Sequence, residues 1–505
     1  MNGVNRGRWL AAVGAVALIC QGAAFAQVGT QVTPPEGEVD TLREALVTTY
    51  GTNPTIMAQR QSLRATDEDA ALARAAGRPT MSVTASYGED LTTRNIAGGT
   101  GRDLNVSATA SVPIYSGGRI RNNVRASDIR VEAGRADLRA TEGDIFTEAV
   151  AAYMDVIRDR SIVQLNENQV RVLSTNLQAT RDRFEVGDLT RTDVAQSDAR
   201  LALARSNLAI VQGRLRASEE NYERVIGVPP GNLQPPPPLP TLPGTAELAA
   251  DVALANNGDL AAIAARARAS GFDVRVAQGG RLPTLSASTT ARYADALGTG
   301  QLGVNGVGLA RDNNGSTSVG LSFSMPIYQG GAAGARVRRA EAVRGQLLEQ
   351  AIGVERLVMS NSQAAFAAYR ASLEAIESNQ IAVAANQLAL EGTRAEQTVG
   401  TRNVLDVLNA EQELLNSQVL LVTARRDAYV AGFQLLNVMG AAEAEDLNLD
   451  GGPLYDPIVN YNRYARSWSD WDDGPMIRPV ATRTAPEQAA SPLTPVVNSV
   501  TRRRQ

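Results

Sequence analysis

Carboxylates and arginines are the only abundant reactive side chains in this sequence of 505 residues, which has 53 Asp and Glu residues against 49 cations. All the cations are arginines, because the sequence contains no lysine; it also contains no histidine, and its one cysteine is Cys20. This composition excludes His-dependent triads, His metal sites, lysine Schiff bases and cysteine-ligated clusters. Neighbouring carboxylates such as Glu219 and Glu220 lack the apolar surroundings that suit acid–base catalysis. We therefore expect no enzyme, no cofactor and, from the net charge of −4, no nucleic-acid partner.

The N-terminus has the pattern of a secretory signal peptide. Two arginines precede an apolar run from Leu10 to Ile19, and Ala24–Ala26 supplies the small residues that a signal peptidase requires. We expect residues 1–26 to be removed, so that the exported protein begins at Gln27. A lipoprotein signal at Cys20 is the alternative, although Ile19 stands where such signals have Gly, Ala or Ser. The rest of the sequence has no apolar run of about 18 residues, so we expect no transmembrane helix.

The remaining sequence consists of two copies of one unit. VPIYSGG, ending at Gly118, recurs as MPIYQGG, ending at Gly331, and FEVGDLTRTDV recurs as QTVGTRNVLDV, with Gly187 matching Gly400. Gly118 and Gly331 differ by 213 residues, as do Gly187 and Gly400, so coincidence is a poor explanation. We expect a first repeat at residues 38–228, a Pro-rich linker at 229–244 and a second repeat at 245–440.

Alternating residues predict one β-hairpin in each repeat. From Leu104 to Ile114, apolar residues at even positions alternate with small polar residues at odd positions, which gives a strand two different faces. Residues 81–87, 285–293 and 319–327 alternate in the same way. A half-buried hairpin of a soluble domain is one interpretation. The nearly uncharged polar face and the predicted export favour a membrane barrel, and tyrosines near the strand ends suit its interfaces: Tyr87, Tyr115, Tyr293 and Tyr328.

Four strands cannot close a membrane barrel, because the edges would leave unpaired amides in hydrocarbon. The barrel must therefore be shared between chains. Two chains would supply eight strands, a number whose interior side chains normally fill, whereas three would supply twelve and leave room for a channel. This argument favours three chains without excluding more.

Long helices account for the rest of each repeat. No proline occurs between Gly118 and Phe184, and at roughly 1.5 Å per residue this stretch could extend about 100 Å. Beyond each reversal glycine, one apolar residue recurs every seven, as in a coiled-coil seam: Val194, Leu201, Leu208, Leu215 and Tyr222, then Val407, Leu414, Leu421, Ala428 and Leu435. Residues 42–75 and 248–277 are also predicted helices. The predicted order of elements in each repeat is therefore helix, hairpin, long helix, reversal and long helix.

This plan resembles the TolC family of outer-membrane efflux proteins over about residues 38 to 440. The resemblance rests on the doubled plan, the two PIYxGG strand exits and the paired VGDLTRTDV and VGTRNVLDV reversals. It implies a mixed fold, an all-α coiled coil plus a membrane β-barrel, in which a homotrimer builds a twelve-stranded barrel in outer-membrane lipid and a twelve-helix periplasmic tunnel. The implied function is a passive exit duct, with a periplasmic adaptor (membrane fusion) protein and an inner-membrane RND or ABC transporter as partners. Drugs, small toxic molecules or secreted polypeptides would pass outward, and the sequence does not distinguish efflux from type I secretion.

The resemblance also implies a gate at the periplasmic tip, closed by the inner helices of the second repeat. Family members have an arginine just after the second VGT, here Arg402, which ties the tip to an aspartate of the neighbouring first-repeat helix, here Asp193 with Thr192 beside it. Asp406, four residues beyond Arg402, would form a ring near the pore axis and favour cations. Ordinary solvated charge on a coiled coil is the alternative interpretation of these residues.

Two positions depart from the pattern of the family's gate. Gln397 replaces the gate tyrosine, and Asn409 replaces a second acidic ring, so we expect both latch and ring to be weaker. The turns at Gly187 and Gly400 are the expected docking points for the adaptor.

The sequence after residue 440 is not repeated. We interpret residues 441–474, which contain Trp468 and Trp471, as a strap packed around the helices, with a recruitment site as the alternative. Residues 475–505 are rich in Pro, Thr and Ala and are predicted to be disordered. The rival to the exit duct is a periplasmic coiled-coil scaffold or adaptor whose hairpins form a small soluble sheet.

Overall fold

The structure is a computed structural model that describes residues 40–89, 102–295, 297, 313–447, 449, 454–475 and 479–481. These residues belong to one compact unit, Gly37–Gln505. The predicted signal peptide at residues 1–26 and nearly all of the predicted disordered tail at 475–505 lie outside the described residues. Within the described ranges, no helix combines the length and the apolarity that crossing a membrane requires.

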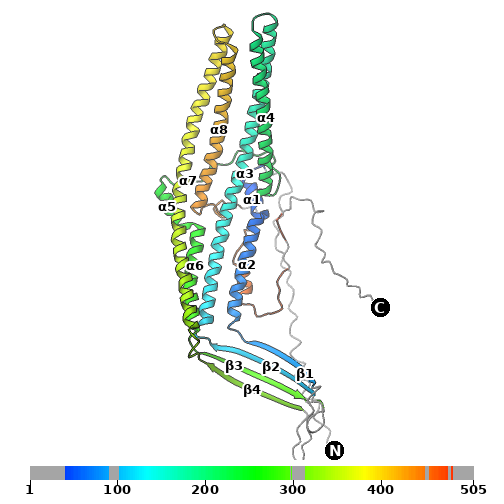
Figure 1. The fold of residues 1–505 in the computed structure, drawn as a ribbon, viewed down its shortest axis with the longest axis vertical. Helices are drawn as coiled ribbons and strands as arrows, with labels where there is room; N and C mark the ends of the chain where they lie inside the picture. The colour runs from blue at the N-terminus through cyan, green and yellow to red at the C-terminus, as the bar shows by residue number, and fades with distance from the viewer. Residues whose placement is uncertain are drawn as a thin grey trace, which may run out of the picture. The chain divides into compact units, whose positions relative to one another are not determined.

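The two repeats fold into the same order of elements (Figure 1). The first contains α1 (Leu42–Thr52), α2 (Pro54–Ala75), β1 (Thr80–Glu89), β2 (Arg102–Tyr115), α3 (Arg119–Glu185) and α4 (Arg191–Ile226). The second contains α5 (Ala246–Asn256), α6 (Gly258–Gly279), β3 (Thr284–Asp295), β4 (Asn313–Ser324), α7 (Ala332–Thr398) and α8 (Val404–Val438), and α9 (Val459–Tyr464) follows. In Figure 1 the sheet lies at one end of the long helices and the two helix reversals at the other. The predicted doubled plan is confirmed.

The first helical segment of each repeat is two helices rather than the single helix that we expected. The Asn53 side chain accepts hydrogen bonds from the backbone N–H groups of Thr55 (2.9 Å) and Ile56 (3.4 Å), and Pro54 begins α2. Proline suits a first helical position because its missing N–H would have had no partner there. In the second repeat Asn257 caps α6 by accepting from the Leu260 N–H at 3.1 Å.

The four strands form one antiparallel sheet in the order β1-β2-β3-β4. The pairing of β2 with β3 joins the two repeats, with Ala108 opposite both Val83 and Ala291. This register places the apolar residues on one face, where large side chains of the outer strands are exposed in the single chain: Met81, Val83, Val319, Leu321 and Phe323. β4 ends at Ser324 instead of the expected Ile327, because Ser324 pairs with Thr284, the first residue of β3, and the ladder has no partner beyond it.

Two apolar clusters hold the helices together. The larger one lies where α1, α3, α4, α5 and α8 meet, and includes Phe146, Tyr153, Tyr222 and Leu435. The Tyr153 hydroxyl donates to the carbonyls of Asp40 (3.0 Å) and Gln234 (2.7 Å), which ties the linker to α3. The smaller one lies between α3, α4 and α8 toward the reversals: Leu173, Leu177, Leu201, Ala204, Val404 and Leu408. Every predicted seam residue of α4 and α8 is buried or half-buried.

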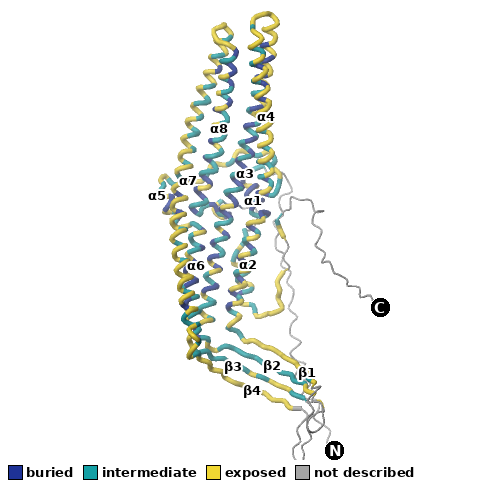
Figure 2. Tube along the Cα trace, viewed as in Figure 1, coloured by how far each residue is buried: buried dark blue, intermediate teal, exposed yellow. Residues whose placement is uncertain are grey.

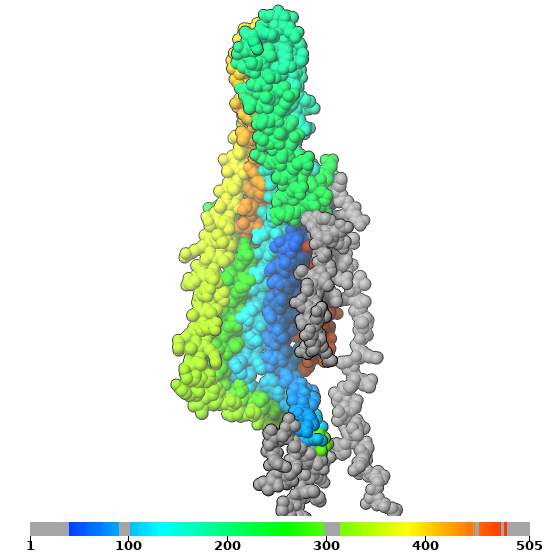
Figure 3. Space-filling model, turned by 45° about the vertical axis from the view of Figure 1, so that its right-hand side comes forward, coloured from blue at the N-terminus to red at the C-terminus, as the bar shows by residue number. Residues whose placement is uncertain are grey.

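Residues 454–475 lie along α2, red beside blue in Figure 3. The Tyr455 N–H donates to the Tyr50 hydroxyl at 3.0 Å, and the Asn460 amide donates to Asp67 at 3.1 Å. The Tyr461 hydroxyl donates to Asp128 of α3 at 3.0 Å. These contacts show that this segment is packed against the helices, as expected for a strap.

Candidate functional site

The helix reversals of the two repeats have the same backbone geometry. The Gly187 N–H donates to the Phe184 carbonyl and the Gly400 N–H to the Gln397 carbonyl, both at 3.0 Å. Both glycines have a left-handed backbone, with φ of 84° at Gly187 and 82° at Gly400, which other residues adopt only with strain. The repeated glycine is therefore what lets each long helix turn back within a few residues.

Asp193 and Asp406, which occupy equivalent positions in the two repeats, do different things. Asp193 forms a capping box with Thr190: its carboxylate accepts from the Thr190 N–H (2.9 Å) and hydroxyl (2.7 Å), while its N–H donates to the Thr190 side chain. The hydrogen bonds from Thr190 lower the pKa of Asp193 from its ordinary value. In α8 the cap is Asn403, whose side-chain oxygen accepts from the Asp406 N–H at 2.8 Å.

Arg402 is exposed and pairs with acidic residues of its own chain. Its Nε donates to Glu396 at 2.8 Å, and its Nη1 lies 3.9 Å from the Asp406 carboxylate. The hydrogen bond to Glu396 raises the pKa of Arg402 above its ordinary value. The equivalent turn of the first repeat is closed by a different pair, Arg183 with Asp188, at 2.7 Å.

The other predicted gate residues lie on the same two hairpins. Gln397 is half-buried in the last turn of α7, and Thr192 is exposed in the first turn of α4. The Asn409 side chain of α8 accepts a hydrogen bond from Arg200 of α4 at 2.7 Å. The structure therefore brings Arg402 and Asp406 together, and uses Asn409 to join the two hairpins. The predicted partner of Arg402, Asp193, belongs to a neighbouring chain and stays a prediction.

Sequence reasoning missed a buried carboxylate below the tip. The Glu411 side chain of α8 is 2% exposed, and its Oε1 accepts from Arg394 of α7 at 2.9 Å and from Asn176 of α3 at 3.0 Å. Its Oε2 is buried without a hydrogen-bond partner among the described residues. Glu411 thus links three helices across both hairpins.

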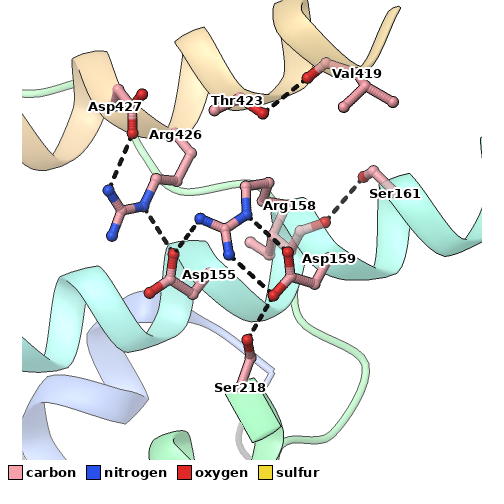
Figure 4. Close-up of polar contacts among 10 residues, drawn as sticks. Asp155, Arg158, Asp159, Ser161, Ser218, Val419, Thr423, Arg426 and Asp427 are labelled. Atoms are coloured by element: carbon pink, nitrogen blue, oxygen red, sulfur yellow. Dashed lines mark hydrogen bonds and ion pairs between the residues drawn. The ribbon is translucent and has the colours of Figure 1, made fainter. Parts of the chain in front are cut away.

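A second charged network joins α3, α4 and α8 nearer their middle (Figure 4). Arg158 binds Asp159 through two nitrogens, at 2.7 and 2.9 Å, and the Ser218 hydroxyl of α4 also donates to Asp159. Arg426 of α8 donates to Asp155 of α3 at 2.8 Å. Because each carboxylate has a partner on its own and on a second helix, the network fixes the relative positions of the helices.

The arrangement offers mechanical ties rather than a reaction centre. In the ranges that the structure describes, no three acidic or other metal-binding side chains gather so that they could hold a metal ion. The charged pairs lie between helices or at helix ends, where they can hold one hairpin against another or release it.

Comparison with known proteins gives a consistent result. The sequence model of a family described as "Outer membrane efflux protein" matches residues 46–228 and 249–441. The chain is 32% identical to the outer membrane efflux protein BepC of Brucella suis biovar 1 over 446 residues, 87% of this chain and 94% of the relative. It is 27% identical to the outer membrane protein TolC of Escherichia coli over 374 residues, 69% of this chain and 74% of the relative. Among solved structures, the CmeC outer membrane channel of Campylobacter jejuni superimposes with a TM-score of 0.71 at 15% identity, over 84% of this chain and 89% of that one.

Proposed function

This chain belongs to the outer membrane efflux protein family, and from that premise we propose how its residues build and gate a duct. The protein is an outer-membrane exit duct of efflux or type I secretion systems, with a β-barrel and a long periplasmic helical part. Its family and fold are those of channel proteins rather than enzymes. The periplasmic scaffold without a barrel, our alternative, does not fit this family.

Much of β1, β4 and α7 is exposed in the single chain (Figure 2), and the observation that carries the proposal is that many of these exposed side chains are large and apolar. β1 and β4 form the two edges of the sheet, and their large apolar side chains are exposed on one face. The 67-residue helix α7 has exposed apolar side chains along its whole length, including Val343, Ile352, Ile381 and Leu388. A soluble monomer rarely exposes so many large apolar side chains along one helix and two sheet edges.

A homotrimer covers these surfaces. Pairing β1 of one chain with β4 of the next removes both edges and gives twelve strands, enough for a water-filled barrel. The same rotation sets α7 of one chain beside α2 of the next, so that the helices form a closed tunnel. The apolar face of the sheet then meets outer-membrane lipid, and the face with Thr109, Thr290 and Ser318 lines water.

We extend the same proposal to the domain boundaries and partners. Residues 38–228 and 245–440 are the two repeats, 229–244 the linker and 441–474 the strap. The turns at Gly187 and Gly400 project furthest from the sheet, which suits docking of a periplasmic adaptor (Figure 1). The adaptor would connect the duct to an inner-membrane RND or ABC transporter that supplies the energy.

The gate is held by Arg402 together with Asp193 of the adjacent chain. A guanidinium has five N–H donors in a planar fork, so Arg402 can keep its bond to Glu396 and also bind a second carboxylate. Asp193 is pre-positioned for this role, because Thr190 fixes its side chain at the start of α4. Asp406 lies beside Arg402 and adds to the negative charge of the pore.

Single-channel conductance in planar bilayers tests the gate. Arg402→Ala should increase conductance, because the tip of α7–α8 loses its tie to the adjacent chain. Arg183→Ala is the matched control: it breaks an equally exposed arginine pair in the equivalent turn, yet should leave conductance unchanged. Equal conductance of parent and Arg402→Ala, or an equal rise in both variants, would count against the latch.

A further inference from the structure

A short loop after α9 presents both tryptophans of the predicted mature chain to solvent. The sequence contains three tryptophans, and Trp9 falls within the predicted signal peptide. Trp468 is 72% exposed and Trp471 is 91% exposed. For large, mostly apolar side chains on a single loop, such exposure is costly in water and calls for a partner surface.

This loop, residues 464–474, is compact and closed at its base. A Cβ added at Gly474 would lie 2.9 Å from the Tyr464 hydroxyl, so the two ends of the loop are in contact. Within it, the Trp471 N–H donates to the Ser469 hydroxyl at 3.3 Å. The loop is therefore a closed, internally hydrogen-bonded segment that carries two exposed rings, rather than a loose end of chain.

Arg78 places this tip at the start of the sheet. The Arg78 guanidinium lies 4.8 Å from the centre of the Trp468 ring and also donates to the Ser467 carbonyl. Arg78 is two residues before β1 begins at Thr80 and three before Met81, the first exposed apolar side chain of that strand. Three residues span at most about 10 Å, whereas the headgroup layer of a bilayer is about 5–7 Å deep on each side. Arg78, and with it Trp468, thus lies within or just outside the headgroup layer if the strands enter lipid at Met81.

The chemistry of the loop matches that layer. Tryptophan prefers the membrane–water interface, where its ring meets acyl chains and its N–H remains hydrogen-bonded. Asp470, Asp472 and Asp473 are neighbours of the tryptophans in the sequence and need water, which limits how deeply the loop can enter. The guanidinium of Arg78 can bind a phosphate while its face rests on Trp468.

We propose that residues 464–474 form a membrane-interface anchor, in which Trp468 and Trp471 enter the phospholipid headgroup layer on the periplasmic side of the outer membrane and Arg78 positions Trp468. The inference rests on the proposed placement of the sheet in that membrane. It gives the strap a lipid-binding role in addition to packing against α2. Three copies around the barrel would fix its height and tilt in the bilayer.

Tryptophan fluorescence tests the anchor directly in the full trimer reconstituted into phosphatidylethanolamine–phosphatidylglycerol vesicles. The phospholipids carry bromine atoms on their acyl chains, either near the headgroup or deep in the bilayer. Bromine quenches tryptophan fluorescence on contact. The single variants Trp468→Phe and Trp471→Phe each leave one tryptophan of the predicted mature chain, so they assign the fluorescence to one ring. The double variant has neither and serves as the blank. Val83→Trp in that blank reports the lipid contact of the sheet independently, because Val83 is an exposed apolar residue in the middle of β1.

We expect shallow bromine to quench Trp468 and Trp471 more strongly than deep bromine, and Arg78→Ala to reduce the quenching of Trp468. Quenching by aqueous acrylamide but not by bromolipid would overturn the anchor, since the rings would then be in water. Protection from both quenchers would also overturn it, because the rings would then be covered by the neighbouring protomer. A quenched Val83→Trp with unquenched loop tryptophans refutes the anchor alone, whereas an unquenched Val83→Trp refutes the membrane placement of the sheet.

Discussion

Replacing Asn176 by leucine should open the tip from within each protomer. The Asn176 amide holds Glu411 of α8 to α3, and its hydrogen bond at 3.0 Å joins the hairpin of the first repeat to that of the second. The acceptor is a carboxylate that is 2% exposed. A hydrogen bond to a buried charge contributes about 1.5–3 kcal/mol, and we take about 2 kcal/mol for this one. That is about a 30-fold shift per protomer toward the released hairpin.

A second hydrogen bond between the two hairpins provides a matched control, because its contribution to the free energy is smaller. Arg200 of α4 donates to Asn409 of α8 at 2.7 Å, which also joins the two hairpins, but both side chains are at the surface. Exposed polar pairs contribute about 0.2–1 kcal/mol, so Arg200→Ala should shift the same equilibrium only about twofold. The comparison separates the loss of a buried tie from a general effect of changing residues near the tip.

Single-channel recording provides the measurement, as the fraction of time spent at higher conductance levels. Asn176→Leu should raise this fraction well above that of Arg200→Ala. The double variant Asn176→Leu/Glu411→Leu should return toward the parent, because an apolar pair leaves no unsatisfied buried charge. Arg394 can lose its partner at little cost, since its side chain is 49% exposed. The reasoning is refuted if Asn176→Leu gates like the parent, or if the double variant is as open as the single one.

Two further predictions concern stability. Burial, opposed by the nearby Arg60, raises the pKa of Glu142 to about 7 from 4.5. Its stabilising contribution is thus complete below pH 4.5 and lost as the pH rises through 7, by about 3 kcal/mol. The temperature at which half of the protein has lost its folded trimer should decrease from pH 5 to pH 8, and Glu142→Gln should make that decrease smaller. An equally steep decrease in the variant would contradict the raised pKa of Glu142. Alanine at Gly187 or Gly400, where an added Cβ meets no atom within 4 Å, should cost about 1–2 kcal/mol through backbone strain alone. Gly213→Ala in the interior of α4 should instead stabilise by about 0.5–1 kcal/mol, and a midpoint that moves alike in both kinds of variant would refute the strain argument.

The fold was predictable from sequence wherever a short-range pattern determines it. The seven-residue spacing from Val194 to Tyr222 defines a helix face that must be covered, and these residues are buried or half-buried. The alternation from Leu104 to Ile114 fixes which side chains share a face of β2, and the pairing with β3 follows that register. The break before Pro54 was missed although its signal was present, since Asn followed by Pro is a common start for a helix.

The ties between the hairpins were not predictable in the same way. Asn176 and Glu411 are 235 residues apart, and nothing in either local sequence distinguishes them from the many solvated polar residues of the coiled coil. Their partnership arises only when α8 packs against α3. Arg402 and Glu396 are different, because position 396 carries Glu where the first repeat has Arg183. A reversed charge beside the repeated glycine was a readable signal of a changed role.

The divergence between the two repeats indicates which hairpin moves. In the first, Thr190 holds the Asp193 side chain in the cap of α4, and Arg183 pairs with Asp188. In the second, Asn403 caps α8 with a neutral side chain, which leaves the Asp406 carboxylate 3.9 Å from an exposed arginine. Thr190 therefore holds Asp193 in one position, whereas the exposed pairs of Arg402 with Glu396 and Asp406 can exchange partners at low cost. The α3–α4 hairpin is therefore suited to be the fixed wall of the duct, and the α7–α8 hairpin to be the part that opens.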